Sequence, residues 1–162
     1  MSAEDRLAAK LSELKIILPP PLAPQGVYRP LVQVGSLVYT AGHLPVLPGG
    51  ELVLGRVGAE LDVDAGYVAA RLAGFGILAS LRTQFGSLDR IRRVIRVFGV
   101  VNCTADFTQQ PGVLNGCSEL FAAVFGPDAG VGVRSAVAAP SLPLGVPVEI
   151  EAIFELEEPP VL

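Results

Sequence analysis

The spacing of hydrophobic residues predicts which parts of the chain are helical and which are extended. Leucines recur at helical intervals over residues 3–15, and Ser2 with Asp5 resembles a capping box at the start of that helix. A run of prolines from Pro19 ends the helix because proline cannot continue its hydrogen-bond ladder. Residues up to Pro24 are therefore predicted to form an extended linker.

The rest of the chain alternates between β-rich runs and segments with helical spacing. Strands are predicted at residues 31–34, 37–41, 91–101, 134–138 and 147–156, and helices from Asp62 or Asp64 to Gly86 and from Pro111 to Gly126. Gly35 and Ser36 suit a hairpin turn between the first two strands, and Gly99 predicts a bend in the long strand. This order predicts an α+β fold with two helices on one face of a mostly antiparallel sheet.

Composition favours a partner for the uncovered face of that sheet. Hydrophobic residues make up 51% of the chain and charged residues only 17%. A domain of 162 residues with so little charge leaves considerable apolar surface to be covered. We therefore expect a homo-oligomer.

The net charge and the first residues of the chain indicate which partners and which cellular location to expect. A net charge of −4 argues against a nucleic-acid partner, and no apolar run approaches the ~20 residues that a membrane span needs. Acidic residues follow Met1 where a secretory signal would place positive charge, so we expect a cytoplasmic protein. Cys103 and Cys117 show neither zinc-ligand nor disulfide spacing, and no metal is expected.

Candidate chemistry rests on a few polar residues, because the common catalytic motifs are absent from the sequence. Alternation over residues 147–156 places Glu149 and Glu151 on one side of a strand, and Arg134 lies on the preceding strand. If they meet across the sheet, the arginine suits binding of a carboxylate and a glutamate suits deprotonation of water. A structural salt bridge explains the same residues. His43 either polarises a substrate or makes structural hydrogen bonds.

Four sequence blocks resemble the Rid family, also called YjgF or L-PSP proteins. They are Tyr28 followed by Gly35 and residues 37–42, then Leu88-Asp89, then Arg134-Ser135-Ala136-Val137, and finally Leu142-Pro143 leading to residues 148–153. The resemblance implies a chorismate-mutase-like fold assembled as a homotrimer, with a cleft between each pair of neighbouring subunits. Members of the RidA type hydrolyse 2-imino and 2-enamino acids to 2-oxo acids and ammonia, with no metal or other cofactor.

The resemblance also implies roles for individual residues. Arg134 would hold the substrate carboxylate, Glu149 would position the attacking water, and Tyr28 would line the cleft from a neighbouring chain. Gly42 and Ala136 would offer backbone contacts.

The chain also departs from the family pattern. His43 stands where the family has a glutamine, and Ser118 stands where a helix asparagine often lines the cleft. The resemblance covers residues 26–156, so residues 1–25 are predicted to be an added helix and linker before a domain at 26–162, as in a longer branch of the family.

Three functions follow from these observations. The leading hypothesis is a deaminase of 2-imino and 2-enamino acids, based on Arg134 and Glu149. The alternative is a non-catalytic binder of small carboxylic acids that uses the same cleft, favoured by Ser118 and the added helix. The third is an endoribonuclease, which would need an arginine cluster to contact phosphates.

Overall fold

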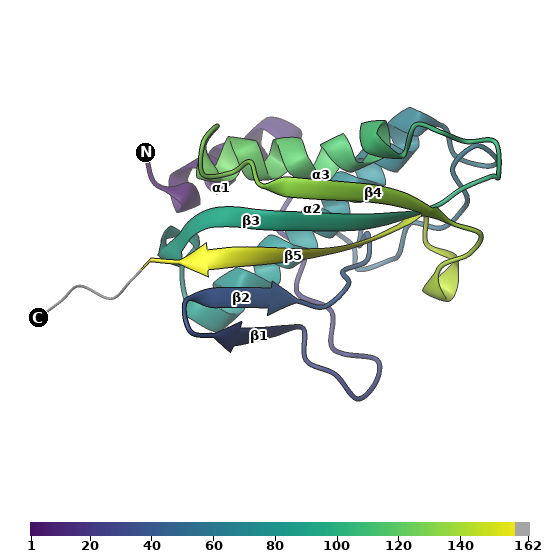
Figure 1. The fold of residues 1–162 in the computed structure, drawn as a ribbon. Helices are drawn as coiled ribbons and strands as arrows, with labels where there is room; N and C mark the ends of the chain where they lie inside the picture. Colours follow the sequence, from purple (N-terminus) through teal and green to yellow (C-terminus); the bar gives the residue numbers. More distant parts are fainter. Residues whose placement is uncertain (158–162) are drawn as a thin grey trace, which may run out of the picture.

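One five-stranded sheet organises the computed structural model, which describes residues 1–157 (Figure 1). The strands are β1 (Leu31–Val34), β2 (Leu37–Thr40), β3 (Ile91–Asn102), β4 (Val133–Ala139) and β5 (Val148–Leu156), in the order β1-β2-β5-β3-β4. Neighbouring strands are antiparallel except β3 and β4, which are parallel because a helix connects them. The predicted α+β fold with a mostly antiparallel sheet is confirmed. Residues 158–162 of the predicted domain lie outside the described residues.

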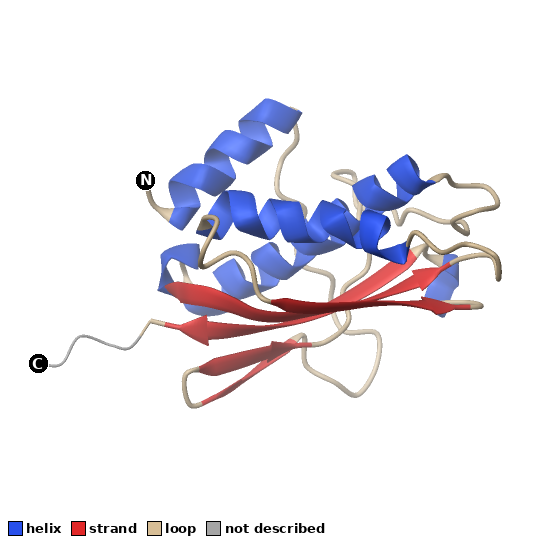
Figure 2. Cartoon of the chain, turned by 45° about the horizontal axis from the view of Figure 1, so that its top comes forward, coloured by secondary structure: helices blue, strands red, loops and turns tan. Residues whose placement is uncertain are grey.

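Helices cover one face of the sheet, as Figure 2 shows. They are α1 (Ala3–Leu14), α2 (Val63–Phe85) and α3 (Gln110–Phe125), with short 3₁₀ turns η1 (Leu88–Arg90) and η2 (Pro143–Gly145). Helices α2 and α3 lie on the sheet, and α1 packs against α3. Leu7 of α1 is 1% exposed and belongs to the same core cluster as residues of α2, α3 and the sheet. The N-terminal helix is thus part of the packed core.

Aromatic rings fill the space between α3 and the sheet. Phe121 and Phe125 of α3 lie with their ring centroids 5.5 Å and 6.1 Å from that of Phe154 on β5, both near edge-to-face. This arrangement is favourable for aromatic quadrupoles. It requires Phe154 to face the helices, and by strand alternation it sends Glu149, Glu151 and Glu155 to the other face.

Helix ends follow the expected capping chemistry. Ser2 and Asp5 form a reciprocal capping box on α1, and the Asp62 side chain accepts a hydrogen bond from the backbone N–H of Ala65 at 2.8 Å. Gly86 ends α2 with a φ of 79°, a left-handed conformation that glycine adopts without steric cost. The predicted helix boundaries are confirmed to within one or two residues.

No break in pairing marks Gly99, where the sequence predicts a bend. Gly99 pairs in register with Ala136 on one side and Ile150 on the other, and the register shifts of β3 lie nearer its start, between Ile91 and Arg96. A Cβ atom at Gly99 would lie 2.7 Å from Cγ of Leu114 on α3. The glycine therefore allows the helix to approach the sheet closely.

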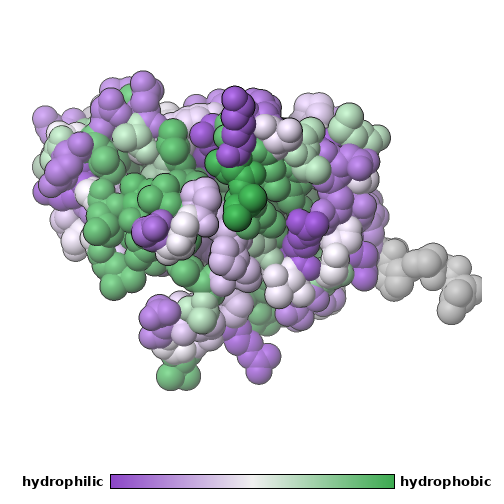
Figure 3. All heavy atoms as spheres, turned by 180° about the vertical axis from the view of Figure 1, so that it is seen from behind, coloured by the Kyte–Doolittle hydropathy of each residue, from purple (hydrophilic) through white to green (hydrophobic). Residues whose placement is uncertain are grey.

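Apolar residues also reach the surface. On the sheet, Val32, Val34, Tyr39, Val133 and Val137 are each more than 40% exposed. The opposite side of the molecule carries further hydrophobic groups between hydrophilic ones (Figure 3). Within residues 1–157, no helix combines the length and the apolar character needed to cross a bilayer.

Candidate active site

Glu149 lies beneath an irregular segment that follows β2. The Thr40 hydroxyl accepts a hydrogen bond from the backbone N–H of Ala152 at 3.0 Å, in place of a regular ladder bond. The chain then leaves the ladder and rejoins β5 at His43, which exchanges backbone hydrogen bonds of 2.7 Å and 3.1 Å with Ile150. Gly42 lies within this irregular segment, directly over the side chain of Glu149.

The close approach of Gly42 fixes the space available to the Glu149 carboxyl group. A Cβ atom at Gly42 would lie 2.8 Å from both Cγ and Cδ of Glu149, which is closer than real Cβ contacts. The predicted site residue Gly42 therefore acts by lacking a side chain. Any larger residue at this position would displace the carboxylate.

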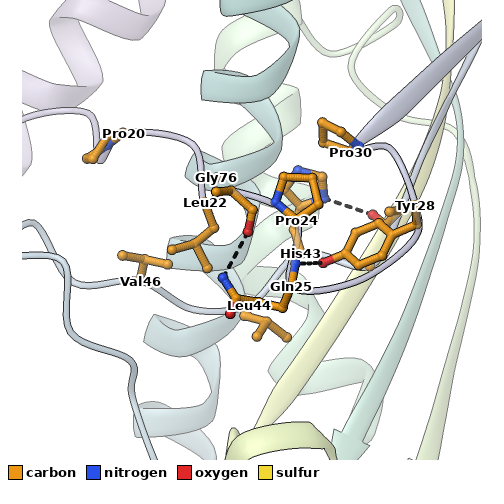
Figure 4. Close-up of a pocket in the computed structure, with 13 residues that line it drawn as sticks. Pro20, Leu22, Pro24, Gln25, Tyr28, Pro30, His43, Leu44, Val46 and Gly76 are labelled. Atoms are coloured by element: carbon orange, nitrogen blue, oxygen red, sulfur yellow. Dashed lines mark hydrogen bonds between the residues drawn. The ribbon is translucent and has the colours of Figure 1, made fainter.

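A pocket of about 480 Å³ opens beside this carboxyl group. It is lined by Gln25, Tyr28, Ala41, Gly42, Leu44, Pro143, Leu144 and Glu149. The Tyr28 hydroxyl accepts a hydrogen bond of 3.2 Å from the backbone N–H of Gln25, which fixes the ring at the pocket wall (Figure 4). The structure thus brings together three of the predicted site residues, Tyr28, Gly42 and Glu149, within one chain.

The environment of Glu149 favours its protonated form. Burial raises the pKa of the Glu149 carboxyl group, and the negative charge of Glu151 on the same strand face raises this pKa further. A carboxylate with a raised pKa is a stronger base than an exposed one, so Glu149 suits proton transfer to and from water.

Arg134 lies in a separate pocket of about 250 Å³ at the edge of the sheet. Its Nη1 atom donates hydrogen bonds to Oδ1 of Asn115 at 2.7 Å and to Oγ of Ser118 at 3.1 Å, both on α3. Among residues 1–157, no carboxylate forms a salt bridge with Arg134, and its Nε and Nη2 atoms make no hydrogen bond. The guanidinium is therefore oriented by neutral groups, and two of its nitrogen atoms are left to bind an anion.

Arg134 and Glu149 do not meet within one chain. Arg134 pairs with Val97 of β3, which pairs in turn with Ala152 of β5, and both of these partners are buried on the helix-covered face. Glu149 projects from the opposite face. This corrects the expectation that the two side chains meet across the sheet, because the alternation of strand side chains separates them.

His43 makes hydrogen bonds through both ring nitrogens. Nδ1 lies 2.8 Å from the carbonyl oxygen of Ala41, and Nε2 lies 2.9 Å from Oγ of Ser80 on α2. Because a carbonyl oxygen only accepts, Nδ1 carries the proton and Nε2 accepts from the Ser80 hydroxyl. Burial lowers the pKa of His43, which keeps the ring neutral. Its geometry fits the structural interpretation.

The remaining predicted residue, Ala136, follows Arg134 by two positions on β4 and packs at the margin of the core. Asn115, in contrast, had not been singled out from the sequence. It lies one helical turn before Ser118 on α3, and that spacing is the signal for a shared helix face. Among the described residues, no group of three His, Cys, Asp or Glu side chains is arranged to hold a metal ion.

Comparison with known proteins supports a single family. Residues 4–155 match the model of the family described as "YjgF/chorismate mutase-like, putative endoribonuclease". Protein TCP17 of Trypanosoma cruzi is 38% identical over 154 residues, which are 95% of this chain and 96% of the relative. The crystal structure of Atu1372 from Agrobacterium tumefaciens is 38% identical, covers 96% of each chain and superimposes with a TM-score of 0.86.

A more distant structure keeps the same architecture. E. coli TdcF with bound serine is 25% identical, with a TM-score of 0.58 over 87% of this chain and 94% of the other. The family match begins within α1, so it includes the N-terminal helix as well as the sheet. The chain therefore belongs to the YjgF/chorismate mutase-like family, in which the Rid proteins are placed.

Proposed function

We propose that this protein is a cofactor-free hydrolase that converts 2-imino and 2-enamino acids to 2-oxo acids and ammonia. The observation that carries this proposal is the Arg134 guanidinium. Asn115 and Ser118 orient it through hydrogen bonds, and it has no carboxylate partner among the described residues. An arginine that formed a salt bridge with a glutamate or aspartate would instead contribute to the stability of the fold. An oriented arginine with open nitrogens suits recognition of a substrate carboxylate.

Glu149 supplies the proton transfers that hydrolysis requires. A 2-enamino acid first gains a proton at its 3-carbon and so becomes the protonated imine. Glu149 takes a proton from water as the water oxygen bonds to the imine carbon, and the C=N electron pair moves to nitrogen. Glu149 then passes this proton to the nitrogen, the C–N bond breaks as ammonia leaves with the bonding pair, and Glu149 takes the hydroxyl proton, which leaves the 2-oxo acid. A protonated imine is already electrophilic, so positioning and a moderately strong base supply most of the rate increase.

A complete site on this proposal requires two copies of the chain. Arg134 and Glu149 lie on opposite faces of the sheet, so one chain offers the carboxylate receptor and its neighbour offers the base. The exposed valines and Tyr39 on the sheet supply apolar surface for that contact. We propose a homotrimer, in which each of three identical interfaces carries one site.

The substrate class agrees with what is bound in a relative. The E. coli TdcF structure contains serine, an amino acid with a carboxylate and a nitrogen on the neighbouring carbon. A 2-imino acid has the same two groups in the same relation. Arg134 is suited to bind the carboxylate, and Glu149 is suited to proton transfer at the carbon and nitrogen of the imine.

An amino-acid oxidase that releases imines in the assay tests this proposal directly. Added protein should speed conversion of the imine to the 2-oxo acid, and Arg134→Ala should lower this rate by at least about a hundredfold because the carboxylate loses its receptor. Arg71→Ala is the matched control, because Arg71 lies on α2 over the Tyr67 ring and outside both pockets. Full activity of Arg134→Ala, or no acceleration for any imine, would contradict the proposal. Binding of 2-oxo acids without turnover of the imines would favour the alternative, a non-catalytic binder of small carboxylic acids.

A further inference from the structure

A second cavity adjoins the Glu149 pocket and is enclosed by the N-terminal linker. It has a volume of about 50 Å³. Its lining comes from the linker, the segment before β1, the segment after β2 and helix α2, and it includes Leu22, Pro24, Tyr28, His43, Val46 and Gly76. Figure 4 shows Leu22 and Val46 toward one end of this cavity and Tyr28 toward the other.

The walls of the cavity carry no charge. Neither aspartate, glutamate, lysine nor arginine lines it. His43 is its basic residue, and burial keeps that ring neutral while Ala41 and Ser80 occupy both nitrogens. The Tyr28 hydroxyl is engaged by the Gln25 backbone. A charged group entering this space would lose its hydration with no counter-charge to replace it.

The cavity lies beside the place where the proposed reaction occurs. Gln25, Tyr28, Ala41, Gly42 and Leu44 line both this cavity and the pocket that contains Glu149. The shared residues place the cavity lined by Leu22 and Val46 next to Glu149, within reach of a substituent on a carbon bound there. The volume corresponds to about four water molecules by the measure in which one occupies ~10 to 15 Å³.

We infer that this cavity receives the side chain of the substrate, and that the protein selects 2-imino acids with short, branched apolar side chains. The inference rests on the proposed function. The linker after α1 is the specificity element, because Pro20, Leu22 and Pro24 form part of the cavity wall and proline restricts the conformations open to this segment.

Gly76 allows the cavity to be made smaller without damage to the fold. A Cβ atom at Gly76 would lie 3.7 Å from Cδ2 of His43 and 3.9 Å from the carbonyl oxygen of Leu44, which are ordinary contacts. Gly76→Ala therefore adds one methyl group at the lining, and alanine is a better helix former than glycine. Gly112→Ala on α3 is the matched control, since its Cβ would meet only Cγ2 of Val63, at 3.6 Å.

Calorimetry with unreactive 2-oxo acids measures the selection. Three 2-oxo acids are compared, with isobutyl, methyl and carboxyethyl side chains, and they are called here the isobutyl, methyl and carboxyethyl acids. The isobutyl acid should bind at least about tenfold more tightly than the methyl acid, and the carboxyethyl acid should bind most weakly. Gly76→Ala should weaken binding of the isobutyl acid by at least about tenfold while changing that of the methyl acid less than twofold, and Gly112→Ala should change neither.

Two results separate this inference from the proposed function. Equal affinities for the three acids, or equal weakening of isobutyl and methyl acids by Gly76→Ala, would overturn the side-chain cavity, whether or not imines are hydrolysed. Side-chain-dependent binding with no imine turnover would retain the cavity and overturn the deaminase. Absence of binding by every acid would overturn the side-chain cavity, and the imine assay alone would then decide the deaminase.

Discussion

Gly42 and Glu149 form the most constrained contact of the candidate site. The glycine has no side chain, and the Glu149 carboxyl group fills the space that a Cβ atom would take. Burial and the nearby Glu151 both raise the pKa of Glu149. The position and the basicity of this carboxyl group therefore depend on different neighbours, and each can be tested by a single substitution.

Gly42→Ala should displace the Glu149 carboxyl group. We expect kcat/KM for imine hydrolysis to fall by about a hundredfold, because a shift of ~1 Å in a reacting group has that effect. Gly26→Ala is the control, since its Cβ would make only ordinary contacts of 3.7 Å with the Tyr28 ring. Activity of Gly42→Ala equal to that of Gly26→Ala would show that the carboxyl position is unimportant.

Glu151→Gln should change the pH dependence of the reaction. Glu149 must be ionised to accept a proton, so its raised pKa sets the acid limb of the kcat/KM profile above the ordinary glutamate value of about 4.5. Removing the Glu151 charge lowers that pKa and should move the limb to lower pH. Glu155→Gln, on the same face of β5 beside Arg92 and Arg93, should leave the limb in place. An unmoved limb in Glu151→Gln would contradict an effect of the Glu151 charge on the base.

The raised pKa of Glu149 also has a consequence for stability. Because its pKa is higher in the folded protein than in the unfolded chain, this group contributes most below its ordinary pKa, and the contribution is lost as pH rises through the folded value. In Glu149→Gln the side chain does not ionise, so the loss of stability that accompanies ionisation of Glu149 is absent. The variant's free energy of unfolding relative to wild type should therefore increase with pH over that range, as denaturant titrations at several pH values would show.

At the scale of elements, the sequence predicts regular structure better than the irregular segment that forms the site. Ser2, Asp62 and Gly86 mark helix ends because capping depends on local chemistry. The departure of the chain after Thr40 depends on a hydrogen bond to Ala152, which is remote in sequence. The role of Gly99 likewise depends on contact with Leu114 of α3. No local sequence pattern predicts the departure of the chain after Thr40 or the packing role of Gly99.

Thr40→Val tests the hydrogen bond that ends β2. The substitution keeps the shape of the side chain but leaves the buried N–H of Ala152 without its partner, which should cost about 1 to 3 kcal/mol of unfolding free energy. Thr40→Ser keeps the hydroxyl group and should recover most of this loss. Chemical denaturation of the two variants measures the difference, and equal stabilities would rule out a contribution from the hydroxyl group.

At the scale of the whole molecule, the separation of Arg134 from Glu149 determines the proposed function. Their chemistry and the family resemblance single them out from the sequence, whereas Tyr28 and Gly42 are indicated by the resemblance alone. That they project from opposite faces follows from the register in which β4 pairs with β3 and β3 with β5, which residue types alone do not reveal. Asn115 was missed for a related reason, since only the packed structure brings α3 beside Arg134.

The central claim is that each site combines Arg134 of one subunit with Glu149 of its neighbour. Arg134→Ala and Glu149→Gln are each expected to be inactive, and the two variants should be unfolded together, refolded as a mixture and assayed for imine hydrolysis. In a randomly mixed homotrimer, about a quarter of the interfaces regain both native residues, so about a quarter of wild-type activity should return. No recovery in mixed trimers, whose composition mass spectrometry verifies, would contradict a site shared between subunits.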